Sequence, residues 1–197
     1  MKTVAIVQAR MGSTRLPNKV MKEINGTPMI EVLLKRLAKS EQIDQIIVAT
    51  SVDAKNDLLV RHVESLGYVC ERGSENDVLE RYYQAAKAHN ADIVIRITGD
   101  CPLVDANLVD IAINDFKDHG VDYLSNTSPA TYPDGLDIEV FTMRVLERAL
   151  TETTSLFDQE HVTPYIRNSG KLRLIRLAIL RICRTCDGPL MSLSILR

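Results

Sequence analysis

Short apolar runs alternate with helical patterns along the first 120 residues, and this alternation constrains the fold more than any other feature of the chain. Four runs rich in Val and Ile have the character of strands buried on both faces: 4–7, 45–50, 68–70 and 92–97. Four segments have the spacing of amphipathic helices: 29–38, 56–66, 78–89 and 108–119. The order predicts a Rossmann-like α/β fold with three αβα layers and a mostly parallel sheet.

The pattern loosens after Gly120. Shorter strands are predicted at 123–125 and 138–141, and helices at 143–150 and 159–166. The loop at 129–137 is long and rich in Pro, Gly and Asp. Since long loops over a rigid sheet commonly carry function, we expect this part of the chain to shape a substrate pocket at the carboxyl ends of the strands.

Composition excludes several classes of protein. With 197 residues and 45% hydrophobic content, the chain suits one domain with one substantial core. Its net charge of −2 argues against a protein built to bind nucleic acid. The chain has no apolar run of about 18 residues, so no membrane span or signal peptide is expected. Four irregularly spaced cysteines fit reduced thiols, which favours the cytoplasm.

The segment Gln8-Ala-Arg-Met-Gly-Ser-Thr-Arg-Leu-Pro-Asn-Lys19 follows directly on the first predicted strand. It combines a glycine, which lets backbone N–H groups approach a phosphate, with three cations and two hydroxyls. It is neither a Walker A loop nor a dinucleotide fingerprint. The segment predicts a triphosphate site, with a solvated basic turn as the alternative.

Together with Ile24-Asn-Gly-Thr-Pro-Met-Ile30, this segment resembles the N-terminal signature of the sugar cytidylyltransferases. These include the acylneuraminate and 3-deoxy-manno-octulosonate enzymes, and the branch named for spore coat polysaccharide biosynthesis protein F is the most similar. The resemblance implies the nucleotide-diphospho-sugar transferase-like form of the fold, and a catalytic role for Arg15 and Lys19. It also implies nucleotide contacts from Gln8, Ala9, Arg10, Gly12, Ser13, Arg15 and Lys19.

A second segment, Thr98-Gly-Asp-Cys-Pro-Leu103, follows the predicted strand at 92–97. A carboxylate at the carboxyl end of a central strand can face a bound phosphate, where Mg²⁺ would bridge the two. The alternative is that Asp100 caps the next helix or orders a turn. The segment resembles the Gly-Asp-x-Pro motif of the same family, which implies that Asp100 is a catalytic metal ligand and that Thr98 lies beside the nucleotide.

Two further groups of residues resemble family patterns, although each is also compatible with ordinary loops, turns and solvent-facing positions. The ends of the strands at 45–50 and 68–70 would contact the base and ribose. The segments 132–140 and 158–163 concentrate carboxylates and a histidine, and would contact the acceptor sugar. The implied nucleotide contacts are Thr50, Ser51, Arg72 and Gly73, and the implied sugar contacts are Asp137, Glu139, Glu160 and His161.

The predicted reaction is attack by a sugar hydroxyl on the α-phosphorus of a nucleoside triphosphate, with CTP as the expected nucleotide and pyrophosphate as the leaving group. Alignment and charge neutralisation carry most of the rate of such a transfer, so a basic loop and an Asp-held Mg²⁺ suffice. The product would serve surface polysaccharide biosynthesis. The alternatives are a glycosyltransferase, for which the usual Asp-x-Asp motif is absent, and a non-catalytic nucleotide-binding protein. A homodimer is one option for the oligomeric state.

Residues 171–197 differ from the rest of the chain, and are predicted to form an aberrant tail after a nucleotidyltransferase domain at 1–170. Six Lys or Arg and one Asp give the tail a net charge of +5, although the whole chain carries −2. In related chains this region runs on to Leu-Arg-Trp-Thr-Val-Asp-x-Pro-Glu, whereas this chain contains no Trp.

The missing family segment is present in another reading frame. Codons can be chosen for residues 180–197 so that a frame moved back by one base encodes Glu-Asp-Leu-Pro-His-Leu-Arg-Trp-Thr-Val-Asp-Glu-Pro-Glu-His-Phe-Glu. The match predicts a frame slip, in the gene or its sequencing, between residues 169 and 180. A divergent C-terminal helix is the alternative.

The resemblance implies that the aspartate of Thr-Val-Asp is a second metal carboxylate. We therefore expect the 197-residue chain to bind nucleotide but to turn over poorly, because Mg²⁺ held by too few carboxylates offsets the phosphate charge poorly. A frame-restored version should be active. Resequencing the source gene and assaying both forms tests this; an intact frame through Arg197, or full activity of the chain as it stands, would contradict the prediction.

Overall fold

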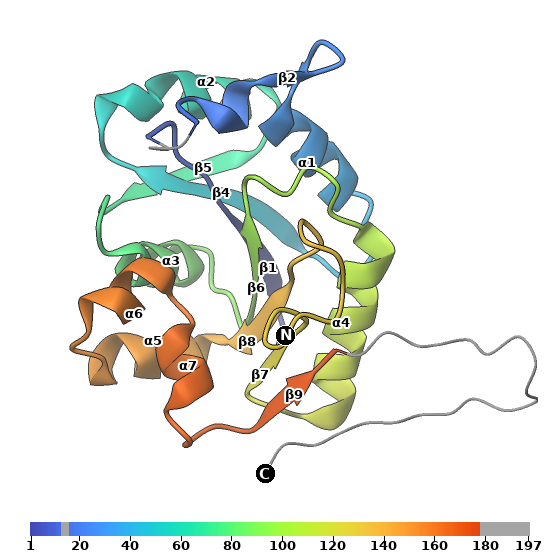
Figure 1. Ribbon diagram of the computed structural model, residues 1–197, viewed down its shortest axis with the longest axis vertical. Coiled ribbons are helices and arrows are strands. Elements are labelled where there is room, and N and C mark those ends of the chain that lie inside the picture. The colour runs from blue at the N-terminus through green and yellow to red at the C-terminus, as the bar shows by residue number, and fades with distance from the viewer. Residues whose placement is uncertain (13–15, 178–197) are drawn as a thin grey trace, which may run out of the picture.

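The computed structural model describes residues 1–12 and 16–177. It contains a seven-stranded sheet covered by helices on both faces (Figure 1). The fold class predicted from the strand and helix pattern, a mostly parallel sheet in three αβα layers, is therefore confirmed. Ser13, Thr14 and Arg15 of the predicted phosphate loop lie outside the described residues, as does the tail from residue 178 onward, where the frame slip is predicted.

The first half of the sheet is parallel. Its strands are β1 (Thr3–Gln8), β4 (Gln45–Ser51), β5 (Val69–Gly73) and β6 (Ile93–Thr98), which lie side by side in the order β5-β4-β1-β6. Three helices connect them: α1 (Met29–Leu37), α2 (Asp57–Ser65) and α3 (Val78–Ala88). All four strands consequently end at the same edge of the sheet, where the motifs singled out above begin.

The second half of the sheet contains a reversal of direction. Strand β8 (Glu139–Thr142) lies antiparallel to β6 on one side and to β7 (Tyr123–Ser125) on the other. Strand β9 (Leu174–Arg176) pairs in parallel with β7 at the edge, so the sheet extends into the segment assigned to the tail. The helices of this half include α4 (Ala106–His119) and α5 (Met143–Glu152).

Successive residues of the central strands are buried on opposite faces, which explains why their apolar runs are continuous. In β1, Ala5 and Val7 pack with α1, α2 and α4, whereas Val4 and Ile6 pack with α3 and α5. Full burial of one large aliphatic side chain stabilises the fold by roughly 1.5–3 kcal/mol. Each face contains many such side chains, and the two layers together hold the strand ends in place.

The single helix predicted at 159–166 is wrong, because the structure has two short helices there, α6 (Leu156–His161) and α7 (Pro164–Asn168). Pro164 lacks a backbone N–H and starts α7, where that donor is not needed. Between the helices, Val162 has φ 69° and ψ −57°, and the N–H of Thr163 donates to the carbonyl of His161 at 2.8 Å. This is a γ-turn of the strained, positive-φ form.

Several small elements lacked a sequence prediction. Strands β2 (Glu23–Ile24) and β3 (Thr27–Pro28) form a hairpin whose two-residue turn, Asn25 and Gly26, has positive φ at both positions. Two turns of 3₁₀ helix, η1 (Lys19–Met21) and η2 (Ala54–Asn56), follow strand ends. Within the described residues, every helix is too short or too polar to cross a membrane.

A buried ion pair joins the parallel and antiparallel parts of the sheet. Arg96 and Glu139 face each other in the register of β6 and β8, and the guanidinium donates to the Glu139 carboxylate. The same carboxylate accepts hydrogen bonds from the Tyr123 hydroxyl and from Thr163 Oγ1, the latter at 2.8 Å. Burial opposes its ionisation, but the Arg96 charge and these donors outweigh burial and lower the pKa of Glu139.

The substitution Glu139→Gln should lower the free energy of unfolding by roughly 3–5 kcal/mol at pH 7, because it leaves the Arg96 charge buried without a counter-charge. The stabilisation by Glu139 is present above the ordinary pKa of glutamate and is lost as the pH falls through the lowered pKa of the folded state. The difference in the free energy of unfolding between variant and parent should therefore shrink in acid. Denaturant unfolding at several pH values measures it.

Glu152→Gln is the matched control, because Glu152 also accepts from several donors but lies at the surface. Glu152→Gln should lower the free energy of unfolding much less than Glu139→Gln does. Equal losses in the two variants, or no loss for Glu139→Gln, would show that the ion pair between β6 and β8 does not stabilise the sheet.

Candidate active site

Two predicted site residues that are far apart in the sequence meet at the strand ends. Lys19, in η1, places its Nζ 3.1 Å from Oδ2 of Asp100, which follows β6. The ammonium group and the carboxylate are both partly exposed, with 34% and 49% of their side chains accessible. The pair therefore remains open to a ligand that could contact either charge.

Asp100 is free to face a ligand because another residue caps the next helix. Asp105 accepts a hydrogen bond from the N–H of Leu108 at 2.9 Å and so forms the N-cap of α4. Burial opposes ionisation of Asp100, but the hydrogen bond and the charge of Lys19 outweigh it and lower the pKa of this carboxyl group. Asp100 is thus an anion at neutral pH, and the capping role considered from the sequence belongs to Asp105.

Gly99 allows the loop after β6 to touch the loop after β1. Its N–H donates to the Gln8 carbonyl at 2.7 Å. A Cβ atom at this position would lie 2.8 Å from both the Gln8 carbonyl oxygen and the Cβ of Ala9, closer than real contacts permit. Only glycine therefore lets these loops approach, and the approach brings Asp100 beside the β1 loop.

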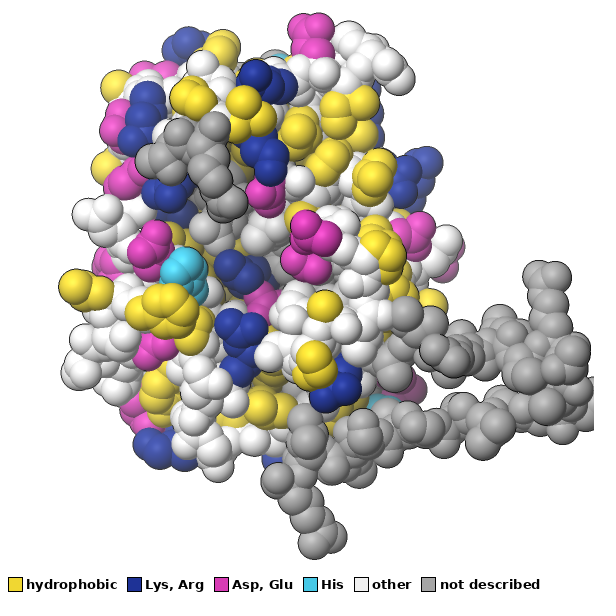
Figure 2. Space-filling view, in the orientation of Figure 1, with side chains coloured by type: hydrophobic (Ala, Val, Ile, Leu, Met, Phe, Trp, Pro, Cys, Tyr) yellow, Lys and Arg dark blue, Asp and Glu magenta, His cyan; other side chains and the backbone are white. Residues whose placement is uncertain are grey.

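A cavity of about 390 Å³ opens between these loops. Lysine, arginine, aspartate and glutamate side chains gather around the hollow in the middle of this face (Figure 2). Five of the residues predicted to contact a nucleotide line it, namely Gln8, Ala9, Arg10, Lys19 and Thr98. The lining residues are Gln8, Ala9, Arg10, Lys19, Val20, Val78, Thr98, Gly99, Asp100, Glu160 and His161.

A second group of charges lies behind the first cavity, around Gly12. Arg10 Nη1 is 3.3 Å from Glu75 Oε1, and Lys55 Nζ is 3.2 Å from the same oxygen. Lys55 also contacts Asp53, at 3.0 Å. A Cβ on Gly12 would lie 2.9 Å from Lys55 Cε, so the close packing of Gly12 here is against a side chain. Lys55 and Glu75 lacked a sequence prediction.

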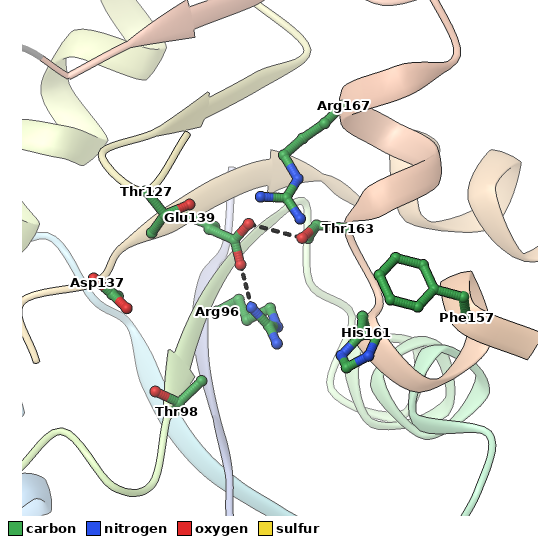
Figure 3. Close-up of a pocket in the computed structure, with 9 residues that line it drawn as sticks. All are labelled: Arg96, Thr98, Thr127, Asp137, Glu139, Phe157, His161, Thr163 and Arg167. Atoms are coloured by element: carbon green, nitrogen blue, oxygen red, sulfur yellow. Dashed lines mark hydrogen bonds and ion pairs between the residues drawn. The ribbon is translucent and has the colours of Figure 1, made fainter. Parts of the chain in front are cut away.

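A second cavity of about 290 Å³ lies over the Arg96–Glu139 ion pair, and we call it the β6–β8 chamber. Figure 3 shows its walls: Phe157 and His161 lie on one side, Asp137 and Thr127 on the opposite side, and Arg167 extends toward Glu139 from α7. The residues that line the chamber are Arg96, Thr98, Thr127, Asp137, Glu139, Phe157, His161, Thr163 and Arg167.

The two acidic residues of the chamber differ in their availability. Glu139 is 3% exposed, and its carboxylate already accepts hydrogen bonds from three protein side chains. Asp137 has no such set of donors. Burial raises the pKa of Asp137, and neighbouring carboxylates, Asp134 first among them, raise it further. Asp137 is consequently the carboxylate that can contact a ligand and that accepts a proton more readily than an ordinary aspartate.

Thr98 and His161 line both cavities, so the two spaces meet at these residues. Thr98 ends β6, and His161 ends α6 immediately before the γ-turn at Val162. Val162 is fully buried, and a β-branched residue with positive φ is strained. This turn sends His161 toward the junction of the cavities and Thr163 toward Glu139, where it donates its hydrogen bond.

Among the described residues expected to contact the nucleotide, Gly12 and four others line neither cavity. Thr50 and Ser51 are fully buried at the end of β4, where Ser51 Oγ accepts from Asn56 Nδ2 at 2.7 Å. Arg72 donates to the carbonyls of the loop after β4 and to Asp57. Gly73 packs against the Arg81 side chain. Glu160, expected at the sugar, lines the first cavity instead.

Five lining residues of the chamber lacked a sequence prediction: Arg96, Thr127, Phe157, Thr163 and Arg167. One signal was available for Arg96, because a charge within the apolar run of β6 must find a partner when buried. Thr163 belonged to the segment predicted as a continuous helix at 159–166, and Arg167 follows that segment directly. The break at Val162 and Pro164 changes which side chains face the chamber.

The described residues contain no cluster of three or more Asp, Glu, His or Cys that could hold a metal ion by itself. Among the described residues that line the first cavity, Asp100 and Glu160 carry carboxylates. Mg²⁺ commonly binds through one or two carboxylates together with substrate phosphates and water. The donor set therefore fits a magnesium ion that arrives with a triphosphate.

Comparison with known proteins agrees with this geometry. The family model described as cytidylyltransferase matches residues 4–186. The spore coat polysaccharide biosynthesis protein SpsF of Bacillus subtilis is 38% identical, over 85% of this chain and 70% of its own length. An uncharacterised protein of Methanocaldococcus jannaschii is 41% identical, over 87% of this chain and 70% of its own.

Solved structures point the same way. A cytidylyltransferase from Leptospira borgpetersenii superposes with a TM-score of 0.87 at 34% identity, covering 90% of this chain and 76% of that one. A CMP:2-keto-3-deoxy-manno-octonic acid synthetase complexed with CTP superposes with a TM-score of 0.68 at 20% identity, covering 90% of each chain. The second likeness shows a shared fold.

We expect Lys19→Ala to weaken the binding of CTP by roughly 1–3 kcal/mol with little effect on folding, because it removes a charge-assisted contact at the edge of the first cavity. Arg15→Ala should act in the same direction, as the loop signature implies. Titration calorimetry with CTP measures the affinity, and thermal unfolding without ligand checks the fold.

Lys22→Ala is the matched control, since Lys22 is an exposed lysine three residues further along that lines neither cavity. It should leave the affinity unchanged. Unchanged affinity in both Arg15→Ala and Lys19→Ala would exclude this loop from the nucleotide site.

Proposed function

Because the chain belongs to the cytidylyltransferase family, we propose that it transfers CMP from CTP to a hydroxyl of a sugar and releases pyrophosphate. The observation that carries this proposal is the meeting of two cavities at Thr98 and His161. One cavity contains cations and a carboxylate suited to a triphosphate. The other is a chamber with mostly polar walls that suits a sugar, so the hydroxyl and the α-phosphorus would meet at the junction.

In this proposal the triphosphate enters the first cavity and divides the Lys19–Asp100 ion pair. A partly exposed pair contributes little free energy, so its opening costs little. Lys19 then donates to a phosphate oxygen, and Arg10 adds a second cation at the same edge. The positions of these cations follow from η1 and from the end of β1, which are fixed by the sheet beneath them.

Asp100 is the residue that would hold Mg²⁺ together with the phosphates. When bound, the ion neutralises charge on the reacting phosphate and helps to orient it. The Lys19 contact keeps Asp100 ionised before the nucleotide arrives. The closeness of the β1 and β6 loops at Gly99 keeps the carboxylate beside the cations that bind the phosphates.

The sugar hydroxyl must lose a proton as it attacks, and we propose that the Asp137 carboxylate accepts this proton. Its raised pKa makes Asp137 a better proton acceptor than an ordinary aspartate. Glu139 is less suited, because its oxygens are engaged by Arg96, Tyr123 and Thr163. The bond from the α-phosphorus to the bridging oxygen breaks, and pyrophosphate leaves through the first cavity.

The names of the relatives support a role in surface polysaccharide biosynthesis. SpsF is named for spore coat polysaccharide. A 3-deoxy-manno-octulosonate cytidylyltransferase of Hydrogenovibrio crunogenus is 29% identical, over 83% of this chain and 61% of its own. We therefore propose an activated sugar for such a polymer as the product, and a keto-sugar acid as the first acceptor to test.

Asp100→Asn should reduce Mg²⁺-dependent turnover far more than it reduces stability, because it preserves the shape of the side chain and removes its charge. The concentration of Mg²⁺ needed for half-maximal rate should rise. Pyrophosphate release from CTP and a panel of keto-sugar acids measures turnover. Near-normal turnover at ordinary Mg²⁺ concentrations would exclude Asp100 as the metal ligand.

Asp137→Asn is a matched second variant, because it changes a carboxylate of the other cavity. The rate of the parent should fall as the pH drops through the raised pKa of Asp137, since a protonated carboxyl group cannot accept the proton. The variant should have a low rate that does not fall further as the pH drops, and the dependence of its rate on Mg²⁺ should match that of the parent. Tight CTP binding with no pyrophosphate release from any sugar would instead indicate a non-catalytic nucleotide-binding protein.

A further inference from the structure

We propose that Phe157 is the platform on which the acceptor sugar lies, with the aromatic face against the C–H face of the sugar ring. The inference rests on the proposed function, because it takes the β6–β8 chamber as the acceptor site. It adds a specificity-determining residue to that site. Phe157 would select sugars in ring form that present a face free of axial hydroxyls.

The first argument is the composition of the chamber. Among its described lining residues, Phe157 is the one apolar side chain, and every other wall is charged or carries a hydroxyl or imidazole group. Figure 3 shows the Phe157 ring across the chamber from Asp137 and Thr127. A ligand in this space therefore meets hydrocarbon on one side and hydrogen-bonding groups on the other.

The second argument is the exposure and orientation of the ring. Phe157 is 60% exposed, which is a large unpaired aromatic surface. Its centroid lies 4.4 Å from that of His161, with an angle of 59° between the planes. Tilted rings at this separation attract each other. Contact with His161 therefore holds the ring in the wall of the chamber before any ligand binds, so a ligand loses little entropy in ordering it.

The third argument is the chemistry of the ligand. A pyranose ring has hydroxyls around its rim and C–H groups on its faces, and those C–H groups carry a slight positive charge. The face of an aromatic ring is negative, so the two attract each other while both lose contact with water. With the sugar on Phe157, its rim hydroxyls remain free to contact the polar walls of the chamber, which include the proposed proton acceptor Asp137.

The neighbouring residue gives a matched control. Leu156 is 82% exposed and precedes Phe157 at the start of α6, yet it lines neither cavity. If the exposed apolar pair instead covered an interface between two copies of the chain, both residues would contribute. If Phe157 binds the sugar, only Phe157 matters for the acceptor.

The experiment compares the full chain with Phe157→Ala, Phe157→Leu, Phe157→Tyr and Leu156→Ala. The first readout is the KM for the keto-sugar acid that the parent uses best, with the KM for CTP measured beside it. The second is saturation-transfer NMR with that sugar, in which irradiation of aromatic protons is relayed to sugar protons in contact with a ring. The chain has no Trp, and Phe157 and His161 are the described aromatic rings that line the chamber.

We expect Phe157→Ala to raise the KM for the sugar by roughly threefold to tenfold and to leave the KM for CTP unchanged. The relay to C–H protons on one face of the sugar should be lost in Phe157→Ala and Phe157→Leu, and retained in Phe157→Tyr and Leu156→Ala. Loss of the relayed signal in Phe157→Leu would show that the aromatic ring, and not only its apolar volume, contacts the sugar. Thermal unfolding verifies that each variant is folded.

An unchanged KM and an unchanged relay in Phe157→Ala would overturn the inference while leaving the proposed function intact. A change of molecular mass by light scattering in both Phe157→Ala and Leu156→Ala would overturn it in favour of an interface between copies. Absence of pyrophosphate release by both the parent and its frame-restored version with every sugar tested would overturn the proposed function itself, and the inference with it.

Discussion

The architecture of the site depends on burying one charge pair between two strands that run in opposite directions. Arg96 and Glu139 face each other across β6 and β8, and further hydrogen bonds to the carboxylate reduce the cost of burying such a pair. Tyr123 and Thr163 supply donors to the carboxylate. Strand β7, strand β8 and the segment after α6 are thereby joined at one point, and that point is the floor of the chamber.

The first cavity, where we propose that the nucleotide binds, is built differently, on close backbone contact rather than on a buried charge. Gly99 lets the loops after β1 and β6 touch, and the cations of this region are paired with carboxylates at the surface. Surface pairs are weak and exchange partners readily. The first cavity is thus electrostatically adaptable, whereas the floor of the chamber is rigid. That difference suits a flexible triphosphate on one side and a compact sugar on the other.

Much of the fold could be predicted from the sequence because buried parallel strands and amphipathic helices leave strong periodic patterns. The nucleotide loop and Asp100 were recognisable because their motifs are continuous in the chain. The chamber was harder to predict, because Arg96, Phe157 and Arg167 come from three elements that only the folded sheet brings together. The prediction of one helix at 159–166 is wrong at Val162, because no local pattern indicates the positive φ of that residue. The Asn25-Gly26 pair, in contrast, is a recognisable sequence signal for the turn of the β2–β3 hairpin.

The junction at Thr98 and His161 has a consequence for how such enzymes diversify. Nearly all of the first cavity is lined by residues up to Asp100, whereas most of the chamber is lined by residues after it. If the cavities have the proposed roles, selection can vary the late half of the gene to admit new sugars while the early half continues to bind the same nucleotide. Of the described lining residues, Thr98 and His161 alone belong to both cavities, so these two positions would change most slowly during divergence.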